Sequence, residues 1–204
     1  ISGNTSDGIF LHTGSDNNTL LNNIVGLRAD GLAALANGAE GISLVSGSNN
    51  NTVGGSAGGE RNIIAGNTGW GIHIGGASQD NSVSGNYTNT IGPNNVISGN
   101  TNDGVFLQEG SSGNTVTGNL IGLNPAGTAG VGNGGHGVQV RDGSNNMIGG
   151  TSAAAGNTIG SNSGDGVYIL RLNAPTLNNT VRFNRLGTNS AGTSALANSA
   201  GVYV

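Results

Sequence analysis

Asp103-Gly104-Val105-Phe106-Leu107 is the stretch that decides the fold, because the chain returns to it at nearly constant intervals. Its core is a glycine followed by an aliphatic residue, any residue and a second aliphatic residue. Successive anchor glycines lie 29 to 35 residues apart, a period typical of stacked repeats. The seven copies are Gly8-Ile9-Phe10-Leu11, Gly41-Ile42-Ser43-Leu44, Gly71-Ile72-His73-Ile74, Gly104-Val105-Phe106-Leu107, Gly137-Val138-Gln139-Val140, Gly166-Val167-Tyr168-Ile169 and Gly201-Val202-Tyr203-Val204.

Two further short phrases follow in each full period, and each begins with asparagine. In the period that starts at Gly104 they are Asn114-Thr115-Val116 and Asn119-Leu120-Ile121. Short runs of β-formers between Gly, Asn and Ser turns are the signature of strands rather than helices. Three strands per period predict a triangular coil, and stacked coils would place each strand beside its own copy about 4.8 Å away. We therefore expect an all-β parallel solenoid of about six coils.

The register of the anchor phrase predicts which side chains are buried. The first and third positions after each glycine lie on one face of a strand, and all fourteen of these residues are aliphatic. We therefore expect this face to form the core. Asparagine stands four residues before six of the seven glycines and three before the last, which predicts ladders of stacked amides. The many glycines suit corners that need a positive φ.

The composition excludes several classes of protein. Charged residues make up 8% of the chain, the net charge is −4 and there is no lysine, so a nucleic-acid-binding surface is not expected. The absence of cysteine rules out disulfides and thiolate metal sites. No apolar run is long enough to span a membrane. We expect no cofactor and no metal, and an extracellular or cell-surface location.

We interpret residues 1–204 as a single solenoid domain that begins and ends in the middle of a coil. Segments 23–38, 119–134 and 184–199 align without gaps, and so do 51–71 and 146–166, which indicates growth by coil duplication. The coil after Gly71 carries an insertion around Thr90-Ile91-Gly92-Pro93. No polar capping repeat is visible at either end. Because solenoids need such caps, we expect a segment of a longer solenoid or a subunit that stacks end to end with copies of itself.

The residue before each anchor glycine forms a second column: Asp7, Glu40, Trp70, Asp103, His136, Asp165 and Ala200. Unpaired acids are too costly for an apolar core, so we expect this column to turn outward. Asp103, His136 and Asp165 would then be neighbours, with Tyr168 and Arg141 on the same sheet face. Acids, a histidine, a tyrosine and an arginine are the groups that proton abstraction beside a sugar carboxylate requires. These five residues are our candidate catalytic set.

Other candidates have simpler interpretations. His12 and His73 have no partner at metal-ligand spacing, which indicates ordinary surface residues. Asp-Gly is also common turn chemistry, so the acidic column can be a solvated edge without catalytic function. Trp70 with Tyr87, or the column Phe106, Tyr168 and Tyr203, could form platforms on which sugar rings stack.

The repeated phrases resemble the right-handed parallel β-helix repeat of pectate-lyase-like proteins and of large secreted bacterial surface proteins. The resemblance covers the whole chain and implies right-handed coiling. It implies no single activity, because this scaffold hosts lyases, hydrolases, epimerases and inert stalks. Mannuronan epimerases, which look like relatives, use an acid, histidine, tyrosine and arginine set, but their contiguous Asp-Pro-His-Asp motif is absent here.

Two classes of function follow. The first is a structural or adhesive solenoid of a secreted or cell-surface protein or filament, in contact with glycans. The alternative is a carbohydrate-active enzyme, of the polysaccharide lyase or uronate epimerase type, that works at Asp103, His136, Asp165, Tyr168 and Arg141.

Overall fold

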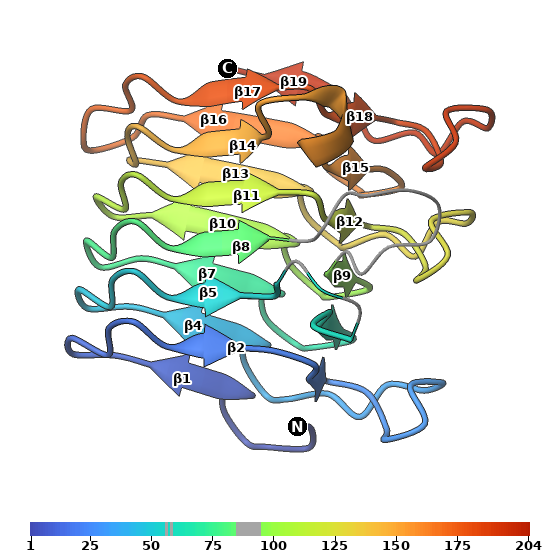
Figure 1. Ribbon diagram of the computed structural model, residues 1–204, viewed down its shortest axis with the longest axis horizontal. Coiled ribbons are helices and arrows are strands. Elements are labelled where there is room, and N and C mark those ends of the chain that lie inside the picture. The colour runs from blue at the N-terminus through green and yellow to red at the C-terminus, as the bar shows by residue number, and fades with distance from the viewer. Residues whose placement is uncertain (56, 58, 85–94) are drawn as a thin grey trace.

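The computed structural model is a parallel solenoid of about six coils with three strands in each coil, and it describes residues 1–55, 57, 59–84 and 95–204. The coils stack along one axis, and the two termini lie at opposite ends of the stack (Figure 1). The predicted insertion at 90–93 and Tyr87 lie outside the described residues. The prediction of an all-β solenoid with three strands per coil is confirmed.

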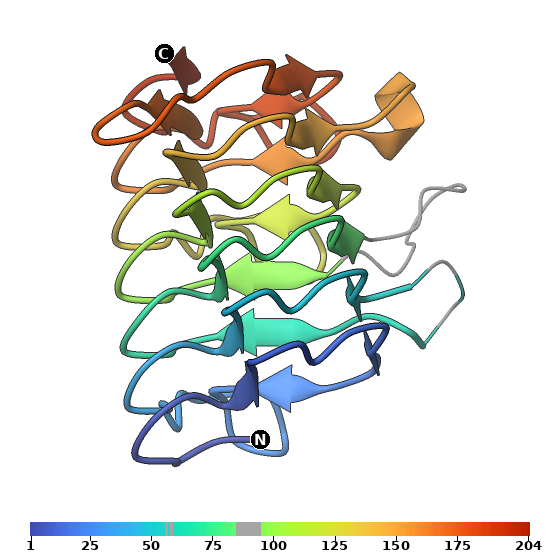
Figure 2. The ribbon, with the colours of Figure 1, turned by 90° about the vertical axis from the view of Figure 1, so that its left-hand side faces the viewer.

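Three parallel sheets form the walls of the solenoid, as the view turned by 90° shows (Figure 2). Sheet A consists of β1 (Ile9–Leu11), β4 (Ile42–Leu44), β7 (Ile72–Ile74), β10 (Val105–Gln108), β13 (Val138–Arg141), β16 (Val167–Leu170) and β19 (Val202–Tyr203). Sheet B consists of β2 (Thr19–Leu20), β5 (Thr52–Val53), β8 (Ser82–Ser84), β11 (Thr115–Thr117), β14 (Met147–Gly149) and β17 (Thr180–Arg182). Sheet C consists of β3 (Ile24–Val25), β6 (Ile63–Ala65), β9 (Val96–Ser98), β12 (Leu120–Ile121), β15 (Thr158–Ile159) and β18 (Arg185–Leu186).

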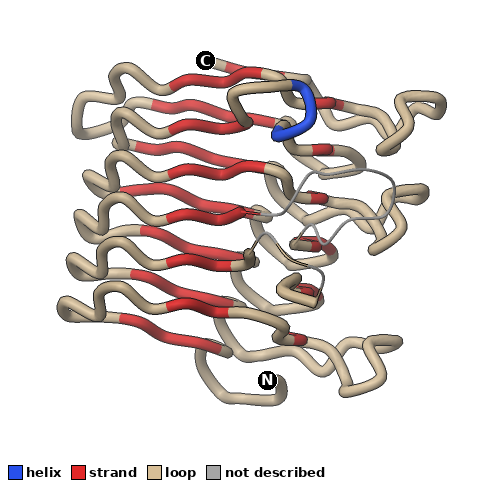
Figure 3. The backbone as a smooth tube through the Cα atoms, in the orientation of Figure 1, coloured by secondary structure: helices blue, strands red, loops and turns tan. Residues whose placement is uncertain are grey.

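The strands are short and the loops between them are long, so most of the backbone is turn or loop (Figure 3). The one helical element of the described chain is a 3₁₀ turn, η1 (Ala153–Ala155). Each strand of sheet A pairs with its own copy in the next coil, for example Val105 with Val138 and Phe106 with Gln139. The register is therefore the one predicted from the anchor phrase.

The core is the column of aliphatic side chains at the first and third positions after each anchor glycine, closed by one aliphatic residue from each strand of sheets B and C. Val105 and Leu107 are fully buried, as are Val116 of sheet B and Ile121 of sheet C. Val202 and Val204, at the end of the described stack, are exposed. Burial of a Val, Leu or Ile side chain contributes roughly 1.5–3 kcal/mol, so the repeated column is the main source of stability.

Three asparagine ladders line the corners of the coil. The sequence predicts a ladder before the anchor glycine and suggests further ladders at the other turns. In each ladder the side-chain Nδ2 of one asparagine donates to the Oδ1 of its copy in the next coil, at 2.8 to 3.2 Å. The first ladder runs through Asn4, Asn37, Asn67, Asn100, Asn133, Asn162 and Asn198. The second runs through Asn18, Asn51, Asn81, Asn114, Asn146 and Asn179, and the third through Asn23, Asn62, Asn95, Asn119, Asn157 and Asn184.

Six of the seven anchor glycines are required by space and not by backbone conformation, and Gly201 is the exception. At Gly104 a Cβ atom would lie 2.7 Å from the carbonyl oxygen of Gly137 and 2.8 Å from Cγ2 of Ile121. The φ angle at Gly104 is not in the positive region. Positive φ occurs at other corners, and several of those positions hold Asn or Asp instead of glycine, such as Asn50 and Asp80. The absence of a side chain at Gly104 thus allows its backbone to pack directly against the backbone of the next coil.

A second, smaller hydrophobic cluster lies on the outer face of sheet C and was not predicted from the sequence. It consists of buried Val96, Leu120 and Leu123, with Ile63 and Leu196 packed against it. Leu123 and Leu196 belong to hairpin loops 122–131 and 187–196, which share an antiparallel bridge pattern with loop 26–35. These loops project on the right side of Figure 1. Leu123 and Leu196 of these loops cover apolar side chains that sheet C would otherwise expose.

Candidate functional site on the outer face of sheet A

The candidate residues lie on the outer face of sheet A and at the turn that leads into it. The side chains at the second position after each anchor glycine point outward and stack from coil to coil in the order Phe10, Ser43, His73, Phe106, Gln139, Tyr168 and Tyr203. Gln108 and Arg141 pair two positions further along β10 and β13. We call the set Trp70, His73, Asp103, Phe106, Gln108, His136, Arg141, Asp165 and Tyr168 the sheet A strip.

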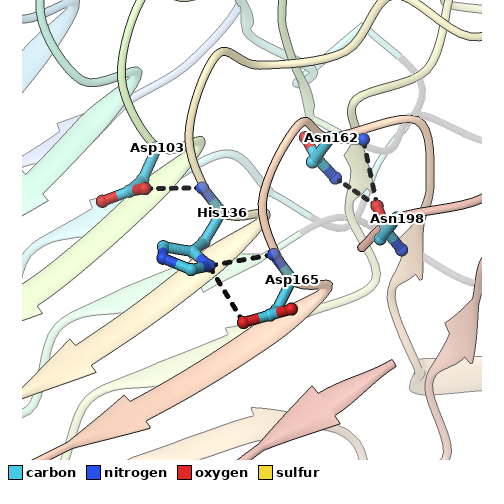
Figure 4. A network of polar contacts seen from close by, with 5 residues as sticks. All are labelled: Asp103, His136, Asn162, Asp165 and Asn198. Carbon is cyan, nitrogen blue, oxygen red and sulfur yellow. Dashed lines mark hydrogen bonds and ion pairs between the residues drawn. The ribbon is translucent and has the colours of Figure 1, made fainter. Parts of the chain in front are cut away.

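Asp103, His136 and Asp165 are neighbours, as the sequence predicts. The Oδ1 atom of Asp103 accepts a hydrogen bond from the main-chain N–H of His136 at 2.6 Å, and Nδ1 of His136 accepts one from the main-chain N–H of Asp165 at 2.9 Å (Figure 4). Nδ1 of His136 also lies 3.6 Å from Oδ2 of Asp165. The first coils repeat this pattern, because Oδ1 of Asp7 accepts from the N–H of Glu40 at 3.0 Å.

The column before the anchor glycine therefore satisfies main-chain donors of the following coil. This role was not predicted, and it changes the expectation that the column is a solvated edge. Asp103 is only 5% exposed and Asp165 9%. Burial raises the pKa of Asp103, although the bond from His136 opposes this shift. Burial and the nearby Asp7 carboxyl raise the pKa of Glu40 to about 7.

An aromatic cluster occupies the middle of the strip. The rings of Trp70 and Phe106 are 4.8 Å apart between centroids, and His73 stands 5.1 Å from Trp70. The guanidinium of Arg141 lies 4.7 Å from the centre of the Phe106 ring, which is a cation–π geometry. Together these neighbours leave Phe106 only 1% exposed, so Phe106 supports the surface and is not itself an open platform for a sugar.

A hydrogen-bond relay ties the same cluster together. Arg141 donates to Oε1 of Gln108, and Nε2 of Gln108 contacts Nε2 of His73 at 2.9 Å. His73 lies on the outer face of sheet A, as expected for a surface residue, but it is half-buried and hydrogen-bonded, which the sequence does not indicate. Burial lowers the pKa of His73 to about 4, so its ring is neutral at physiological pH. His12, by contrast, is exposed and contacts the hydroxyl of Thr13, as expected for a surface histidine.

Tyr168 provides a half-buried ring at the end of the strip. Its ring stacks on the imidazole of His136 with centroids 4.4 Å apart and planes at 6°, and it meets Tyr203 at 5.2 Å. The structure thus brings Asp103, His136, Asp165 and Tyr168 into one group. Arg141 lies on the same sheet face and is directed to Gln108 and Phe106 of the preceding coil. The catalytic role of the five residues stays a prediction. Among the described residues, no cluster of acids, histidines and cysteines could hold a metal ion.

The fold of the chain is similar to that of solved structures. The crystal structure of the periplasmic alginate epimerase AlgG matches 100% of this chain with a TM-score of 0.62 and 19% sequence identity. A double mutant of AlgG matches with a TM-score of 0.63 and 18% identity. The chain is a right-handed parallel β-helix. It covers 43 to 44% of the AlgG chains, and at this identity the likeness establishes the fold alone.

No protein-family model and no curated protein matches the sequence. No helix in the described part of the chain is long and apolar enough to cross a bilayer.

Proposed function

We propose that the chain is a secreted or cell-surface β-solenoid module that binds a polysaccharide along the sheet A strip. The observation that carries this proposal is the stacking of three rings along sheet A: His136 in the turn before β13, Tyr168 on β16 and Tyr203 on β19. Their centroids lie 4.4 and 5.2 Å apart, close to the strand spacing of about 4.8 Å, so the three rings form one surface along the solenoid axis. A chain of sugar rings presents a repeating apolar face to such a surface.

Polar groups border the aromatic surface and can bind the hydroxyl and carboxylate groups of sugars. Arg141 carries the one cationic side chain on the outer face of the described part of sheet A. Its attachment to Gln108 and Phe106 fixes the guanidinium, which is the group best suited to a carboxylate. A uronate-containing polysaccharide therefore suits the strip better than a neutral glucan.

The geometry supports binding better than catalysis. Oδ1 of Asp103 and Nδ1 of His136 are both engaged by main-chain N–H groups of the next coil. Atoms that hold the solenoid together in this way are poorly placed to exchange protons with a substrate. The exposed part of the strip consists of rings and donors, and these need no proton transfer to bind a sugar.

Binding can be tested by isothermal titration with alginate, polygalacturonate and the neutral glucan pullulan. We expect the two uronate polymers to bind, and we expect Tyr168→Ala to weaken binding by about tenfold, which is about 1.4 kcal/mol. Phe183→Ala is the matched control, because Phe183 is an exposed aromatic residue that lies between β17 and β18, away from sheet A. The proposal fails if none of the three polymers binds, or if both variants weaken binding equally.

A second candidate function is a carbohydrate-active enzyme of the lyase or epimerase type. Two observations favour it: the fold likeness to AlgG, and the convergence of Asp103, His136, Asp165 and Tyr168 on one sheet face. The same uronate polymers would be incubated with the protein and followed by ultraviolet absorbance for an unsaturated product and by NMR for epimerisation. Turnover that disappears in His136→Ala would establish the enzyme and replace the binding proposal.

A further inference from the structure

His136 is held by one contact of its main chain and by two contacts of its imidazole, one at Nδ1 and one on the ring face. Its own main-chain N–H donates to Asp103, its Nδ1 accepts from the main-chain N–H of Asp165, and its face stacks on Tyr168. The side chain is 24% exposed. No main-chain or side-chain group among the described residues bonds to Nε2, so this atom is available to a ligand.

The contact with Asp165 determines which ring nitrogen carries the hydrogen. A nitrogen that accepts a main-chain N–H at 2.9 Å must present its lone pair, so Nδ1 is not protonated and the hydrogen of the neutral ring is on Nε2. The competing arrangement is an ion pair between Nδ1–H and Oδ2 of Asp165. That pair is longer, at 3.6 Å, and would direct the Nδ1 hydrogen close to the Asp165 N–H. The shorter hydrogen bond therefore sets the tautomer.

We propose that His136 is a fixed Nε2–H donor of the sheet A strip, which binds a carboxylate or hydroxyl oxygen of the polysaccharide, and that it is not a proton acceptor. This inference rests on the proposed function for the identity of the ligand. A base that removes a proton from a sugar carbon needs a free lone pair, and the accessible nitrogen of His136 has none. The Nε2–H group instead gives the strip a directed donor beside the stacking surface of Tyr168.

His73 gives an internal contrast on the same sheet. Oε1 of Gln108 accepts from Arg141, so the Nε2 of Gln108 is the donor in its contact with Nε2 of His73. Nε2 of His73 is then the acceptor, and its hydrogen is on Nδ1. The strip therefore holds its two histidines in opposite tautomers. His73 directs its acceptor nitrogen into the hydrogen-bond relay, and His136 directs its donor nitrogen to the accessible surface.

The tautomers can be read directly from long-range ¹H–¹⁵N correlation spectra of the uniformly ¹⁵N-labelled protein at neutral pH. We expect the Nε2–H form for His136 and the Nδ1–H form for His73. Asp165→Asn keeps the main-chain N–H and removes the carboxylate, so the His136 pattern should persist in that variant. An Nδ1–H or doubly protonated His136 in the parent protein, or a change of tautomer in Asp165→Asn, overturns the inference.

The donor role is tested separately by affinity. His136→Phe keeps a ring on Tyr168 and removes the donor, so we expect it to weaken the binding of alginate by about tenfold in the same titration. His136→Gln keeps a side-chain N–H donor and should bind more tightly than His136→Phe. Equal affinity of His136→Phe and the parent protein overturns the donor role while the proposed function stands. Absence of alginate binding by the parent protein overturns the proposed function and the ligand assignment together, whatever the tautomer.

Discussion

Replacement of Asn100 by aspartate tests whether the asparagine ladders hold the coils together. Asn100 is 1% exposed. Its Oδ1 accepts from the main-chain N–H and the Nδ2 of Asn67, at 3.2 and 3.0 Å. Its Nδ2 donates to Oδ1 of Asn133 at 3.0 Å and to the carbonyl oxygen of Ile64 at 3.2 Å. Aspartate has the same shape and keeps both acceptor contacts, but it loses both donor contacts.

The expected cost follows from the groups that the change leaves unpaired. The carbonyl of Ile64 loses its side-chain donor, and an oxygen of the new carboxylate would face Oδ1 of Asn133 at the 3.0 Å that the amide now spans. An unpaired buried polar group costs roughly 1–3 kcal/mol. A buried charge that has no compensating partner costs about 3–5 kcal/mol. We therefore expect Asn100→Asp to lower the free energy of unfolding by about 3–5 kcal/mol at pH 7, a large part of the usual total.

The loss should depend on pH in a defined direction. Burial and the facing oxygen raise the pKa of the new carboxyl above its unfolded value of about 3.9, so the folded variant binds more protons than the unfolded one above that pH. Its stability should fall as the pH rises from about 4 to 7, and it should partly recover in acid, where the carboxylic acid can again donate one hydrogen bond.

Urea denaturation followed by circular dichroism and by the fluorescence of Trp70, the one tryptophan of the chain, measures this effect. Asn102→Asp is the matched control, because Asn102 is exposed in the same turn and makes no side-chain hydrogen bond that the ladder uses. The pH effect is taken as the difference between the two variants. The reasoning is refuted if the variants agree within about 0.5 kcal/mol at pH 7, the range of ordinary surface substitutions.

Three further changes test the packing and the charges. Gly104→Ala should destabilise the protein by about 1–3 kcal/mol in chemical denaturation, because its Cβ would lie 2.7 Å from a carbonyl oxygen, whereas Gly201→Ala, with its nearest contact at 3.7 Å, should cost much less. The raised pKa of Glu40 beside Asp7 makes the folded state bind more protons than the unfolded state between about pH 4.5 and 7, so the parent protein should lose stability as the pH rises through this window. Glu40→Gln should remove this loss, as measured by thermal unfolding at several pH values. Leu123→Ala should lower the free energy of unfolding by about 2–5 kcal/mol, because Leu123 is fully buried on the outer face of sheet C; a loss no larger than that of an exposed leucine would show that the second cluster is not a true core.

The fold could be predicted from the sequence because stacked coils repeat each position at a fixed place in space. Aliphatic residues recur at the positions of Val105 and Leu107 in every coil, so one strand predicts the core of the strands that lie inside the stack. The ladder of Asn100 and its copies is predicted by the same argument, since residues at equal offsets from the anchor glycine must lie above one another. The prediction that glycines occupy corners with positive φ is confirmed at positions such as Gly54 and Gly149, whereas the anchor glycines are needed for close contact between coils.

The candidate site was predicted only in part. The sequence places Asp103, His136 and Asp165 in one column, but the column's hydrogen bonds join a side chain of one coil to the main chain of the next. A spacing in residues does not reveal such a bond, because it depends on where the turn directs the N–H. The burial of His73 escaped prediction for a related reason: it results from Gln108 of the next coil and from Trp70 of the turn that leads into β7.

The second hydrophobic cluster also escaped prediction, because Leu123 and Leu196 lie in loops rich in glycine and small residues, without the alternation that marks a strand. The gapless alignment of 23–38, 119–134 and 184–199 was the available signal. Loops that only connect strands tolerate insertions, whereas these keep their length. Their constant length reflects their packing on sheet C, where the N–H of Ser190 also donates to the carbonyl of Gly127 in the neighbouring loop.

The ladders also affect how the protein ages chemically. Asn37 and Asn133 each precede a glycine, and the side-chain carbonyl carbon of such an asparagine is open to attack by the following main-chain nitrogen. The attack expels ammonia and forms a cyclic imide, and water then opens the ring to leave an acid. In the folded chain both amides are clamped above and below by their copies, which keeps them from the geometry of attack. An unfolded chain has no such protection. Each period of unfolding would therefore leave some molecules with an acid inside the stack, and these molecules would refold with the reduced stability expected of Asn100→Asp.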